Sequence, residues 1–572
     1  MKLTISKSKN AEQLYICKSI RVNKNKTTSQ IFKKLGSMES LLPLHDNDRE
    51  KVIAWAKEQA AIYTEAERQE NLEVLVKFAE GRQIEKDERL TFNGGYLFLQ
   101  DIFHEIGFDK ICKQITDKYN FEFDFADILA KLIYTRIIAP SSKCSSFEYS
   151  KKFIETPKFD LHQIYRALDV INNQTDFIQE STYSATLALG KRNTGILYYD
   201  CTNYFFEIDE PKDDKQFGKS KENRPNPIVQ MGLLMDGDGL PLAFTTFAGN
   251  ESEQPTLIPL EKRIVKDFHL AKFVVCTDAG LASTANRKFN NINNRSYVVT
   301  QPLKKIKKHL KEWALDPKGW YLINDSKQYN LNEIDERIHM NSIFYKERWI
   351  NENGIEQRLI VSFSPKYKAY QESVRSRQIE RALKIIDKGE KAHTRNSHSP
   401  TRFIDEIKAT DEGEVATKSS RSLDAEKIAE EAAFDGFYAV CTTLEDDISE
   451  IIKINKRRWE IEESFKIMKS EFKARPVFLQ DKGRIKAHFT TCFLSLLIFR
   501  LLERKLNEKY TVTQIISTLR EMNFRRLKGI GYLPGFTRTD LTDELHRTFG
   551  FNLDTEIITD KKMKKIIKKT KH

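Results

Sequence analysis

Two apolar runs that each meet an aspartate constrain the fold of this chain most strongly. Residues 194–206 contain Ile-Leu-Tyr-Tyr before Asp200, and residues 271–282 contain Phe-Val-Val-Cys-Thr before Asp278. Short continuous apolar runs bounded by turn residues are typical of strands that are covered on both faces. The pattern therefore predicts a buried sheet with a carboxylate at the end of each of two strands. A single aspartate in such a place more often caps the next turn than forms a site.

A third carboxylate falls in a charged segment near residue 460. Asn455, Arg458, Glu462 and Lys469 are separated by three, four and seven residues, so a helix with 3.6 residues per turn returns them to one stripe. The plain interpretation is a solvated helix surface, because many exposed helices have charges at such spacings. Combined with the two strand-end aspartates, however, Glu462 completes a set of three hard oxygen ligands, which is enough to hold two divalent cations.

These residues together resemble the DDE transposases of bacterial insertion sequences, in the branch with a Tyr-x2-Arg-x3-Glu-x6-Lys signature and a long insertion before the glutamate. Arg458, Glu462 and Lys469 match that signature, whereas Asn455 stands where the family usually has tyrosine. An asparagine amide can still donate a hydrogen bond in place of the tyrosine hydroxyl. Further matching blocks lie in about 190–290 and 434–502. The resemblance implies an α/β fold: an RNase H-like mixed-sheet core, interrupted by a β-containing insertion and preceded by a mainly helical region.

The resemblance also implies the chemistry. Asp200, Asp278 and Glu462 are the expected catalytic residues and the ligands of two Mg²⁺ ions, which Mn²⁺ can replace. Paired metal ions activate a water or a DNA 3′-hydroxyl and stabilise the leaving oxygen at phosphorus. The expected contacts with DNA phosphates come from five side chains: Asn455, Arg458, Lys469, Lys221 and Arg224. For Lys221 and Arg224, an ordinary charged loop is an equal alternative.

The composition agrees with a polyanionic partner. Lys and Arg number 94 against 82 Asp and Glu, a net charge of +12, which favours nucleic acid. Because nucleotide bias alone can enrich a chain in lysine, the charge is supporting only. The seven cysteines have no CxxC or paired spacing, which disfavours a zinc site or a disulfide framework. With no apolar signal segment at the N-terminus, we expect a cytoplasmic, nucleoid-associated protein without a membrane partner.

A chain of 572 residues is too long for one compact core and predicts several domains. Apolar residues recur at three and four positions between 96 and 190, as an amphipathic bundle requires. In the family that the chain resembles, the region ahead of the first aspartate recognises the element's ends. The expected parts are an N-terminal region (1–95), a helical DNA end-binding region (96–190), a first core part with both aspartates (191–290), an insertion domain (291–433), a second core part with the glutamate helix (434–505) and a C-terminal region with a basic tail (506–572).

The insertion has its own local signals. Asn353-Gly354 predicts a turn between strands at 342–349 and 356–363. A polar helix is expected over about 366–388, and residues 391–422, which have little to bury, are expected to form a mobile loop. For the three tryptophans of the insertion the core is the favoured place, and stacking on a flipped DNA base is the alternative: Trp313, Trp320 and Trp349.

Two segments near the C-terminus carry further expectations. The apolar run 489–499 is too short to span a bilayer and predicts a buried helix. The lysine-rich residues 561–571 predict a frayed, solvated terminus, with contact to DNA phosphates as the alternative.

The expected function is a transposase that binds the terminal inverted repeats of its insertion sequence, cleaves the DNA ends and joins the free 3′ ends to target DNA. Cutting of paired ends implies a homodimer in the synaptic complex. Two alternatives stay open: a catalytically idle DNA-binding repressor or domesticated remnant of the same fold, and a nuclease that acts on RNA or on unrelated DNA. The presence of all three acidic residues favours the enzyme over the remnant.

Overall fold

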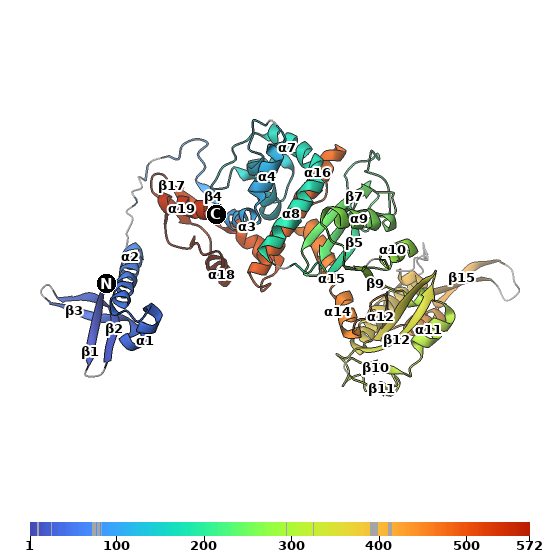
Figure 1. Ribbon diagram of the computed structural model, residues 1–572. Coiled ribbons are helices and arrows are strands. Elements are labelled where there is room, and N and C mark those ends of the chain that lie inside the picture. Colours follow the sequence, from blue (N-terminus) through green and yellow to red (C-terminus); the bar gives the residue numbers. More distant parts are fainter. Residues whose placement is uncertain are drawn as a thin grey trace. The chain divides into compact units, whose positions relative to one another are not determined.

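The computed structural model describes residues 1–571 with gaps at 9–10, 24–25, 71–75, 77–79, 82, 120, 191, 293, 324, 389–398 and 410–414. The chain divides into two compact units, Met1–Glu88 and Arg89–His572. Each unit has a hydrophobic core of its own (Figure 1).

The smaller unit is an antiparallel sheet packed with helices. Its strands lie in the order β1-β2-β3 and span Lys2–Ser8, Ala11–Asn23 and Lys26–Ser37. A short helix α1 (Met38–Leu41), a 3-10 turn (Leu42–His45) and the long helix α2 (Arg49–Glu70) follow. The core of this unit consists of Leu14, Met38, Leu41, Val52 and Ala56.

The larger unit begins with a helical bundle, as the periodicity over 96–190 predicts. Its helices are α3 (Tyr96–Ile106), α4 (Phe108–Thr116), α5 (Phe125–Ile138), α6 (Lys143–Ser150), α7 (Leu161–Asn173) and α8 (Thr175–Leu189). Segments from the far end of the chain complete the bundle: α16 (Lys482–Lys505), α17 (Val512–Glu521), α18 (Asp540–Phe549) and α19 (Asp560–Lys569). A small antiparallel sheet, ordered β19-β18-β17-β4, joins the two ends: β4 (Thr91–Asn93), β17 (Asn523–Leu527), β18 (Gly531–Pro534) and β19 (Ile558–Thr559).

Helix α16 is the central helix of this bundle and contacts α3, α5, α7 and α8. Among the described residues it is the one helix that is long and apolar enough to cross a membrane, yet 83% of its apolar window is buried inside the protein. A helix that is apolar on all sides is what the centre of a bundle requires. The buried helix predicted from residues 489–499 is therefore the middle of α16.

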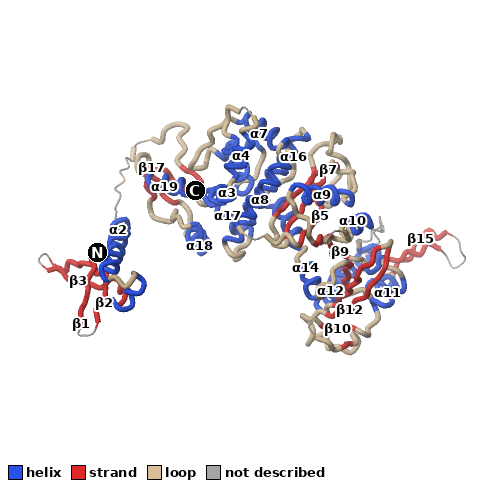
Figure 2. The backbone as a smooth tube through the Cα atoms, viewed as in Figure 1, coloured by secondary structure: helices blue, strands red, loops and turns tan. Residues whose placement is uncertain are grey.

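The part of the larger unit that contains Asp200 and Asp278 is built on a mixed sheet (Figure 2). β5, β6 and β7 are antiparallel, whereas β8 and β9 run parallel to β5, in the order β7-β6-β5-β8-β9. These five strands span Ile196–Phe205, Ile228–Asp236, Pro241–Ala248, Val274–Thr277 and Ser296–Thr300. With helices on both faces, this arrangement confirms the expected RNase H-like α/β core.

Most strands of the insertion continue the same sheet, whereas β14 and β15 form a separate two-stranded one. β16 (Phe437–Thr442) pairs with β9, and β13, β12, β10 and β11 follow outward, giving ten strands in all. The added strands span Trp320–Leu322 (β10), Gln328–Tyr329 (β11), Phe344–Glu352 (β12) and Ile355–Phe363 (β13). Asn353 and Gly354, both with positive φ, form the predicted turn between β12 and β13.

Both faces of the ten-stranded sheet are covered by helices. Tyr198 on β5 packs with the helical bundle in the main core. Its neighbour Tyr199 points the other way, into a second core with α9 (Leu257–Asp267) and α11 (Lys308–Leu315). Because strand side chains alternate between faces, a strand covered on both sides is apolar over a continuous run, as β5 is before Asp200.

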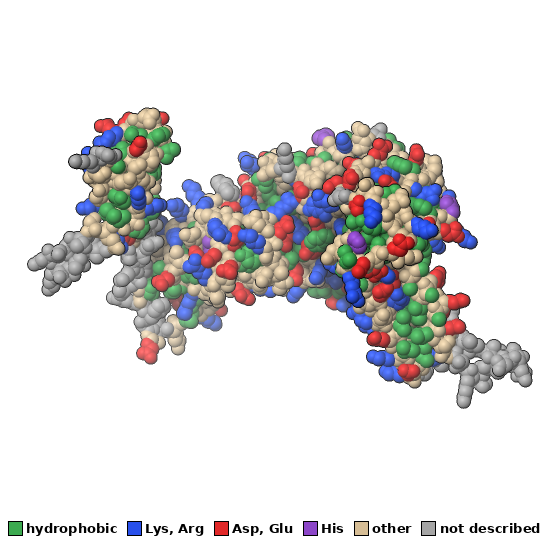
Figure 3. Space-filling view, turned by 90° about the horizontal axis from the view of Figure 1, so that it is seen from below, with side chains coloured by type: hydrophobic (Ala, Val, Ile, Leu, Met, Phe, Trp, Pro, Cys, Tyr) green, Lys and Arg blue, Asp and Glu red, His purple; other side chains and the backbone are tan. Residues whose placement is uncertain are grey.

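Two segments differ from their sequence-based expectations. In the stretch 391–422 after α12 (Pro365–Asp387), where a loop was expected, the described residues form most of a β-hairpin, β14 (Ile404–Ala409) and β15 (Val415–Leu423), and residues 391–398 and 410–414 of that expected loop lie outside the described residues. Helix α13 (Ala425–Ala432) follows. The lysine-rich terminus is the helix α19, not a frayed tail, because Met563 and Ile566 are buried and anchor it to the unit. On the face of the molecule shown in Figure 3, basic and acidic side chains are interspersed.

Candidate active site

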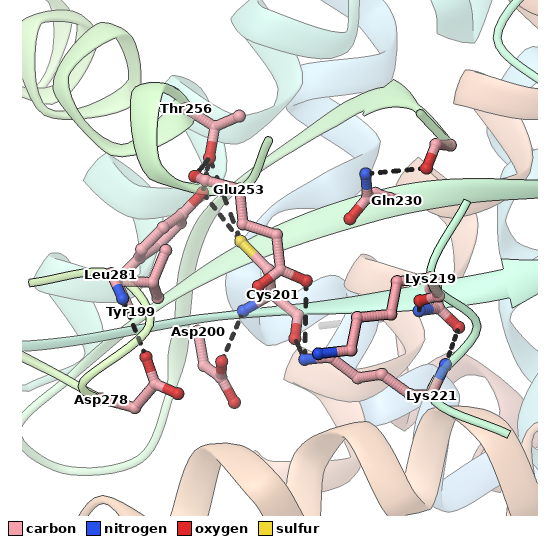
Figure 4. A network of polar contacts seen from close by, with 12 residues as sticks. Tyr199, Asp200, Cys201, Lys219, Lys221, Gln230, Glu253, Thr256, Asp278 and Leu281 are labelled. Carbon is pink, nitrogen blue, oxygen red and sulfur yellow. Dashed lines mark hydrogen bonds and ion pairs between the residues drawn. The ribbon is translucent and has the colours of Figure 1, made fainter. Parts of the chain in front are cut away.

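Asp200 and Asp278 lie next to each other on neighbouring strands. β5 and β8 pair in parallel with Tyr198 opposite Cys276, and the same register two residues further places Asp200 opposite Asp278. Adjacent strands are about 4.8 Å apart, so the two carboxylates come close together. Figure 4 shows both side chains pointing to the same side. Asp278 directly follows β8 as predicted, but Asp200 lies in the middle of β5, because β5 continues to Phe205 in its pairing with β6.

The face of β5 that carries Asp200 is the face against which the glutamate segment packs. Alternation puts Asp200 on the same side as Tyr198. The Tyr198 hydroxyl donates a hydrogen bond to the carbonyl of Ile454 at 2.9 Å. Ile454 belongs to α14 (Ile448–Lys456), which leads into α15 (Trp459–Lys466). This contact fixes the approach to Glu462 against the strand of Asp200.

The charged segment predicted as one helix consists of two helices and a π-helical turn. Asn455 is in the last turn of α14, Arg458 caps the start of α15, and Glu462 is in the first turn of α15. Lys469 lies in the π-helical turn η5 (Ile467–Glu471). A π turn winds more slowly than an α-helix and frequently marks a functional site. The single stripe expected from a period of 3.6 therefore does not reach Lys469.

Arg458 connects Glu462 with the aspartates. Its Nη2 lies 3.6 Å from Oε1 of Glu462, one helical turn away. Burial acts to lower the pKa of Arg458, but Tyr438, Glu462 and Asp278 keep that pKa above its usual value. The Glu462 side chain is 59% exposed. Among the described residues, no three His, Cys, Asp or Glu side chains are grouped so that they could hold a metal ion, so the structure does not bring Glu462 together with the aspartate pair.

Asp200 is a half-buried carboxylate beside a second carboxylate, Asp278. Burial raises its pKa from 3.8 to about 6; Lys221 acts against this rise and Asp278 adds to it. Backbone N–H groups donate to one oxygen of each carboxylate, from Cys201 to Asp200 at 2.7 Å and from Leu281 to Asp278 at 3.1 Å. Two adjacent carboxylates repel each other when both are ionised, and a bound cation removes that repulsion.

Two of the predicted phosphate-binding residues lie within electrostatic reach of Asp200. Lys221 donates to the carbonyl of Cys201 and lies 3.7 Å from Oε1 of Glu253 (Figure 4). Burial, followed by repulsion from Lys221, lowers the pKa of Lys469 to about 8, whereas Asp200 acts to raise it. The two lysines therefore lie near each other and near Asp200, where they can attract a DNA phosphate.

The remaining two predicted contacts have different surroundings. The guanidinium of Arg224 lies over the ring of Phe205 at 4.2 Å and 3.8 Å from Oε2 of Glu222. Asn455 lines a cavity of about 340 Å³ between the insertion strands and α14. Its Oδ1 is buried and has no hydrogen-bond partner. The Oδ1 of Asn455 is therefore an unpaired hydrogen-bond acceptor at a mostly apolar pocket.

The aspartate pair fits a divalent cation in donor chemistry. Carboxylate oxygens are the ligands that Mg²⁺ prefers, and burial together with the neighbouring Asp278 raises the pKa of Asp200, a shift that a bound cation would oppose. Glu462 is paired with Arg458, so its side chain must turn toward Asp200 and Asp278 before it can share in holding a metal. A bound metal ion would supply an activated hydroxyl and stabilise the leaving oxygen.

Three residues of this region were not predicted from the sequence: Glu222, Arg475 and Arg136. Glu222 is ion-paired with Lys469 and with Arg475. Its position between Lys221 and Arg224, two predicted phosphate-binding cations, was a signal that the sequence did contain. Arg136 on α5 is buried and donates hydrogen bonds to the carbonyls of Phe472 and Lys473. No sequence pattern connects residue 136 with a segment more than three hundred residues away.

An RNase H-like core with adjacent strand-borne aspartates and a nearby helix carrying an Arg-x3-Glu pair is the architecture of DDE-type nucleic-acid enzymes. A family model described as "Transposase DDE domain" matches residues 205–498, and the chain belongs to this family. The matched range includes Asp278, Arg458, Glu462 and Lys469, and it begins just after Asp200.

Two solved structures are similar to the chain. One is the synaptic complex of piggyBac transposase with hairpin DNA, at 8% identity and a TM-score of 0.35, covering 83% of this chain and 84% of that one. The other is the Mos1 transposase paired-end complex with the left transposon end, at 13% identity and a TM-score of 0.14, covering 46% of this chain and 75% of that one. No curated protein sequence matches the chain.

Proposed function

We propose that this protein is the transposase of an insertion sequence. It binds the terminal inverted repeats of its own element, cleaves the DNA ends by metal-dependent phosphodiester hydrolysis and joins the free 3′ ends to target DNA. The observation that supports the proposal most is the parallel register of β5 and β8, which leads Asp200 to Asp278. Two carboxylates held on rigid strands are a stable platform for metal ions.

Each charged residue has a role in this proposal. Asp200 and Asp278 hold the metal ions, two Mg²⁺ or Mn²⁺, and Glu462 joins them when DNA is bound. Arg458 now pairs with Glu462 at 3.6 Å, and an incoming phosphate gives this guanidinium another partner. The exchange frees the Glu462 carboxylate to turn toward the aspartates. Lys469 and Lys221 bind the backbone phosphates on either side of the scissile bond.

The partners follow from the reaction. The substrate is double-stranded DNA, both the terminal repeats and the target, and the bundle formed by α3 to α8 is the proposed region of end recognition. Cutting of two ends in one complex requires two active sites, so we propose a homodimer in the synaptic complex. The place of action is the cytoplasm, at the nucleoid.

The test uses purified protein and a labelled duplex that carries the repeats flanking the gene. With Mg²⁺, the protein should nick the duplex at the element boundary and leave a duplex with scrambled repeats intact. Equal cleavage of both duplexes would favour a general nuclease. Cleavage of RNA in preference to DNA would exclude the transposase.

A second candidate is a DNA-binding repressor of the same fold that does not cleave. The observation that favours it is the position of Glu462, whose largely exposed side chain pairs with Arg458 and not with the aspartates. Tight binding to the repeats without any nicking in Mg²⁺ or Mn²⁺ would identify this candidate.

A further inference from the structure

Glu222 lies among three cations beside the candidate active site. Its Oε1 is ion-paired with Lys469 at 3.7 Å and with Arg475, and its Oε2 lies 3.8 Å from Arg224. The cations come from two separate parts of the chain: Arg224 from the β5–β6 connection, and Lys469 and Arg475 from η5 and the segment that follows it. One carboxylate therefore faces three positive charges, and the group keeps a net positive charge.

Aromatic rings at the end of β5 support these cations. The guanidinium groups of Arg224 and Arg475 lie over the ring of Phe205 at 4.2 Å and 5.8 Å, and the ammonium of Lys469 lies over Tyr204 at 5.7 Å. Side chains held over aromatic faces lose little further freedom on binding an anion. The cations are thus arranged in advance around one anionic position.

A DNA phosphate matches that position. A phosphodiester carries one negative charge and two free oxygens, as a carboxylate does, and paired contacts with arginine are its preferred form of recognition. The group lies beside the aspartate pair, because Lys469 sits over Tyr204, which is four residues beyond Asp200 on β5 and on the same face of that strand.

The β5–β6 connection is anchored on one side of Glu222. Asn203 on β5 donates to the carbonyl of Lys219 at 3.2 Å and accepts from the Lys221 N–H at 3.3 Å. Beyond this anchor, the N–H groups of Glu222 and Arg224 both donate to the hydroxyl of Ser220 at 3.2 Å. The Glu222 side chain itself is held by its ion pairs with the surrounding cations, which are the contacts that a phosphate would take over.

From these contacts we infer that Glu222 occupies, in the DNA-free protein, the place of a DNA backbone phosphate between Lys469, Arg475 and Arg224. DNA displaces the carboxylate, and Arg475 becomes a phosphate-binding residue of the same site. The inference rests on the proposed function, since it needs DNA as the ligand. Its consequence is an internal brake: the protein binds DNA more weakly than its cations allow until Glu222 leaves.

The experiment measures binding of the full-length protein to a repeat-bearing duplex in EDTA, so that cleavage does not interfere. Glu222→Gln keeps the shape of the side chain and removes its charge. It should bind the duplex about three- to tenfold more tightly than the unchanged protein at about 0.1 M salt. The control Glu210→Gln removes the same charge from an exposed position of the same connection and should bind within twofold of the unchanged protein.

Arg475→Gln provides a second, independent readout. If Arg475 binds a phosphate, this variant should bind more weakly, and the slope of log K against log salt should fall by about 0.9, the value for one phosphate contact on duplex DNA. Circular dichroism verifies that each variant is folded.

Any of four results would overturn the inference. Unchanged or weaker binding by folded Glu222→Gln would mean that Glu222 only positions the cations, and an unchanged salt slope for folded Arg475→Gln would remove the phosphate contact. Equal tightening by Glu210→Gln would reduce the effect to net charge. Absence of duplex binding by every form of the protein would overturn the proposed function as well, which separates the two failures.

Discussion

The guanidinium of Arg458 lies 3.6 Å from the carboxylate of Glu462 and within electrostatic reach of Asp278. This one side chain therefore separates the third acidic residue from the first two in the DNA-free protein. The arrangement is reasonable for an enzyme whose metal ligands must not lie together without a cation, because three unpaired carboxylates repel each other. In the proposed mechanism, a phosphate that binds Arg458 would release the Glu462 carboxylate from its ion pair.

Replacement of Arg458 by alanine should affect DNA binding more than folding. The ion pair has a largely exposed partner, so its loss should lower the free energy of unfolding by no more than about 1 kcal/mol. Loss of a phosphate contact should weaken duplex binding by about tenfold. Fluorescence anisotropy with labelled duplex and urea unfolding measure the two effects. Lys453→Ala, at a 66% exposed cation of α14, is the control, and an equal loss there would contradict a specific role for Arg458.

The half-buried carboxylate of Asp200 should make the metal-free protein less stable as the pH rises. Its pKa is about 6 in the folded protein and 3.8 ordinarily, so the folded state holds this proton more tightly than the unfolded state. Stability from this group is therefore present below about pH 4 and is lost as the pH rises to about 6. At pH 7.5 the ionised group costs about 3 kcal/mol.

Asp200→Asn tests this pH dependence in EDTA. The variant should unfold at a higher temperature than the unchanged protein at pH 7.5, and the two should converge near pH 4. Asp209→Asn is the control, because Asp209 is exposed in the connection between β5 and β6. This variant should melt at the same temperature as the unchanged protein at both pH 7.5 and pH 4. A lower melting temperature for Asp200→Asn at pH 7.5 would show that the ionised Asp200 carboxylate does not destabilise the folded protein.

Arg136 should be needed for the segment that carries Lys469. Its guanidinium is buried and donates to the carbonyls of Phe472 at 3.1 Å, Lys473 at 3.4 Å and Ser141 at 3.1 Å. Arg136→Met keeps much of the volume and leaves these carbonyls unpaired, which should lower the free energy of unfolding by about 3–5 kcal/mol. Arg166→Met, on the exposed side of α7, is the control for urea unfolding. A loss below 1 kcal/mol at Arg136 would mean that other contacts hold the segment.

Replacement of Asn455 by tyrosine, the residue that the family usually has at this position, should strengthen DNA binding. The cavity beside Asn455 has about 340 Å³ of free volume, so a phenol ring has room and its hydroxyl can reach a phosphate from the rim. Asn455→Tyr should therefore bind the duplex more tightly and cleave it faster. Asn455→Ala should weaken binding but leave folding nearly unchanged, because the buried Oδ1 has no partner to lose. Weaker binding by a folded Asn455→Tyr protein would show that the pocket serves another purpose.

The core could be predicted from the sequence because its signals are local. The apolar runs around Asp200 and Asp278 gave the two parallel strands, and Asn353-Gly354 gave the hairpin between β12 and β13. The continuation of the core sheet into the insertion could not be predicted, because it depends on the pairing of β16 with β9 across more than 130 residues. Pairings of that separation leave no periodic trace in the sequence.

The candidate site was predictable in its residues but not in its arrangement. The spacing of Arg458 and Glu462 gave their contact correctly. The π-helical turn at Lys469 could not be anticipated, since it arises from packing against the bundle and turns Lys469 toward Glu222 instead of along the predicted stripe. Which rotamer Glu462 adopts also depends on these tertiary contacts.

The most direct test of the central claim, that Asp200, Asp278 and Glu462 act together in metal-dependent cleavage, is a cleavage assay with the repeat-bearing duplex. The unchanged protein should nick the element boundary in Mg²⁺ or Mn²⁺ and not in EDTA. Folded Asp200→Asn, Asp278→Asn and Glu462→Gln proteins should each lose cleavage by at least about a hundredfold while still binding the duplex. Cleavage by Glu462→Gln at the rate of the unchanged protein would contradict the claim, because Glu462 would then have no part in the reaction.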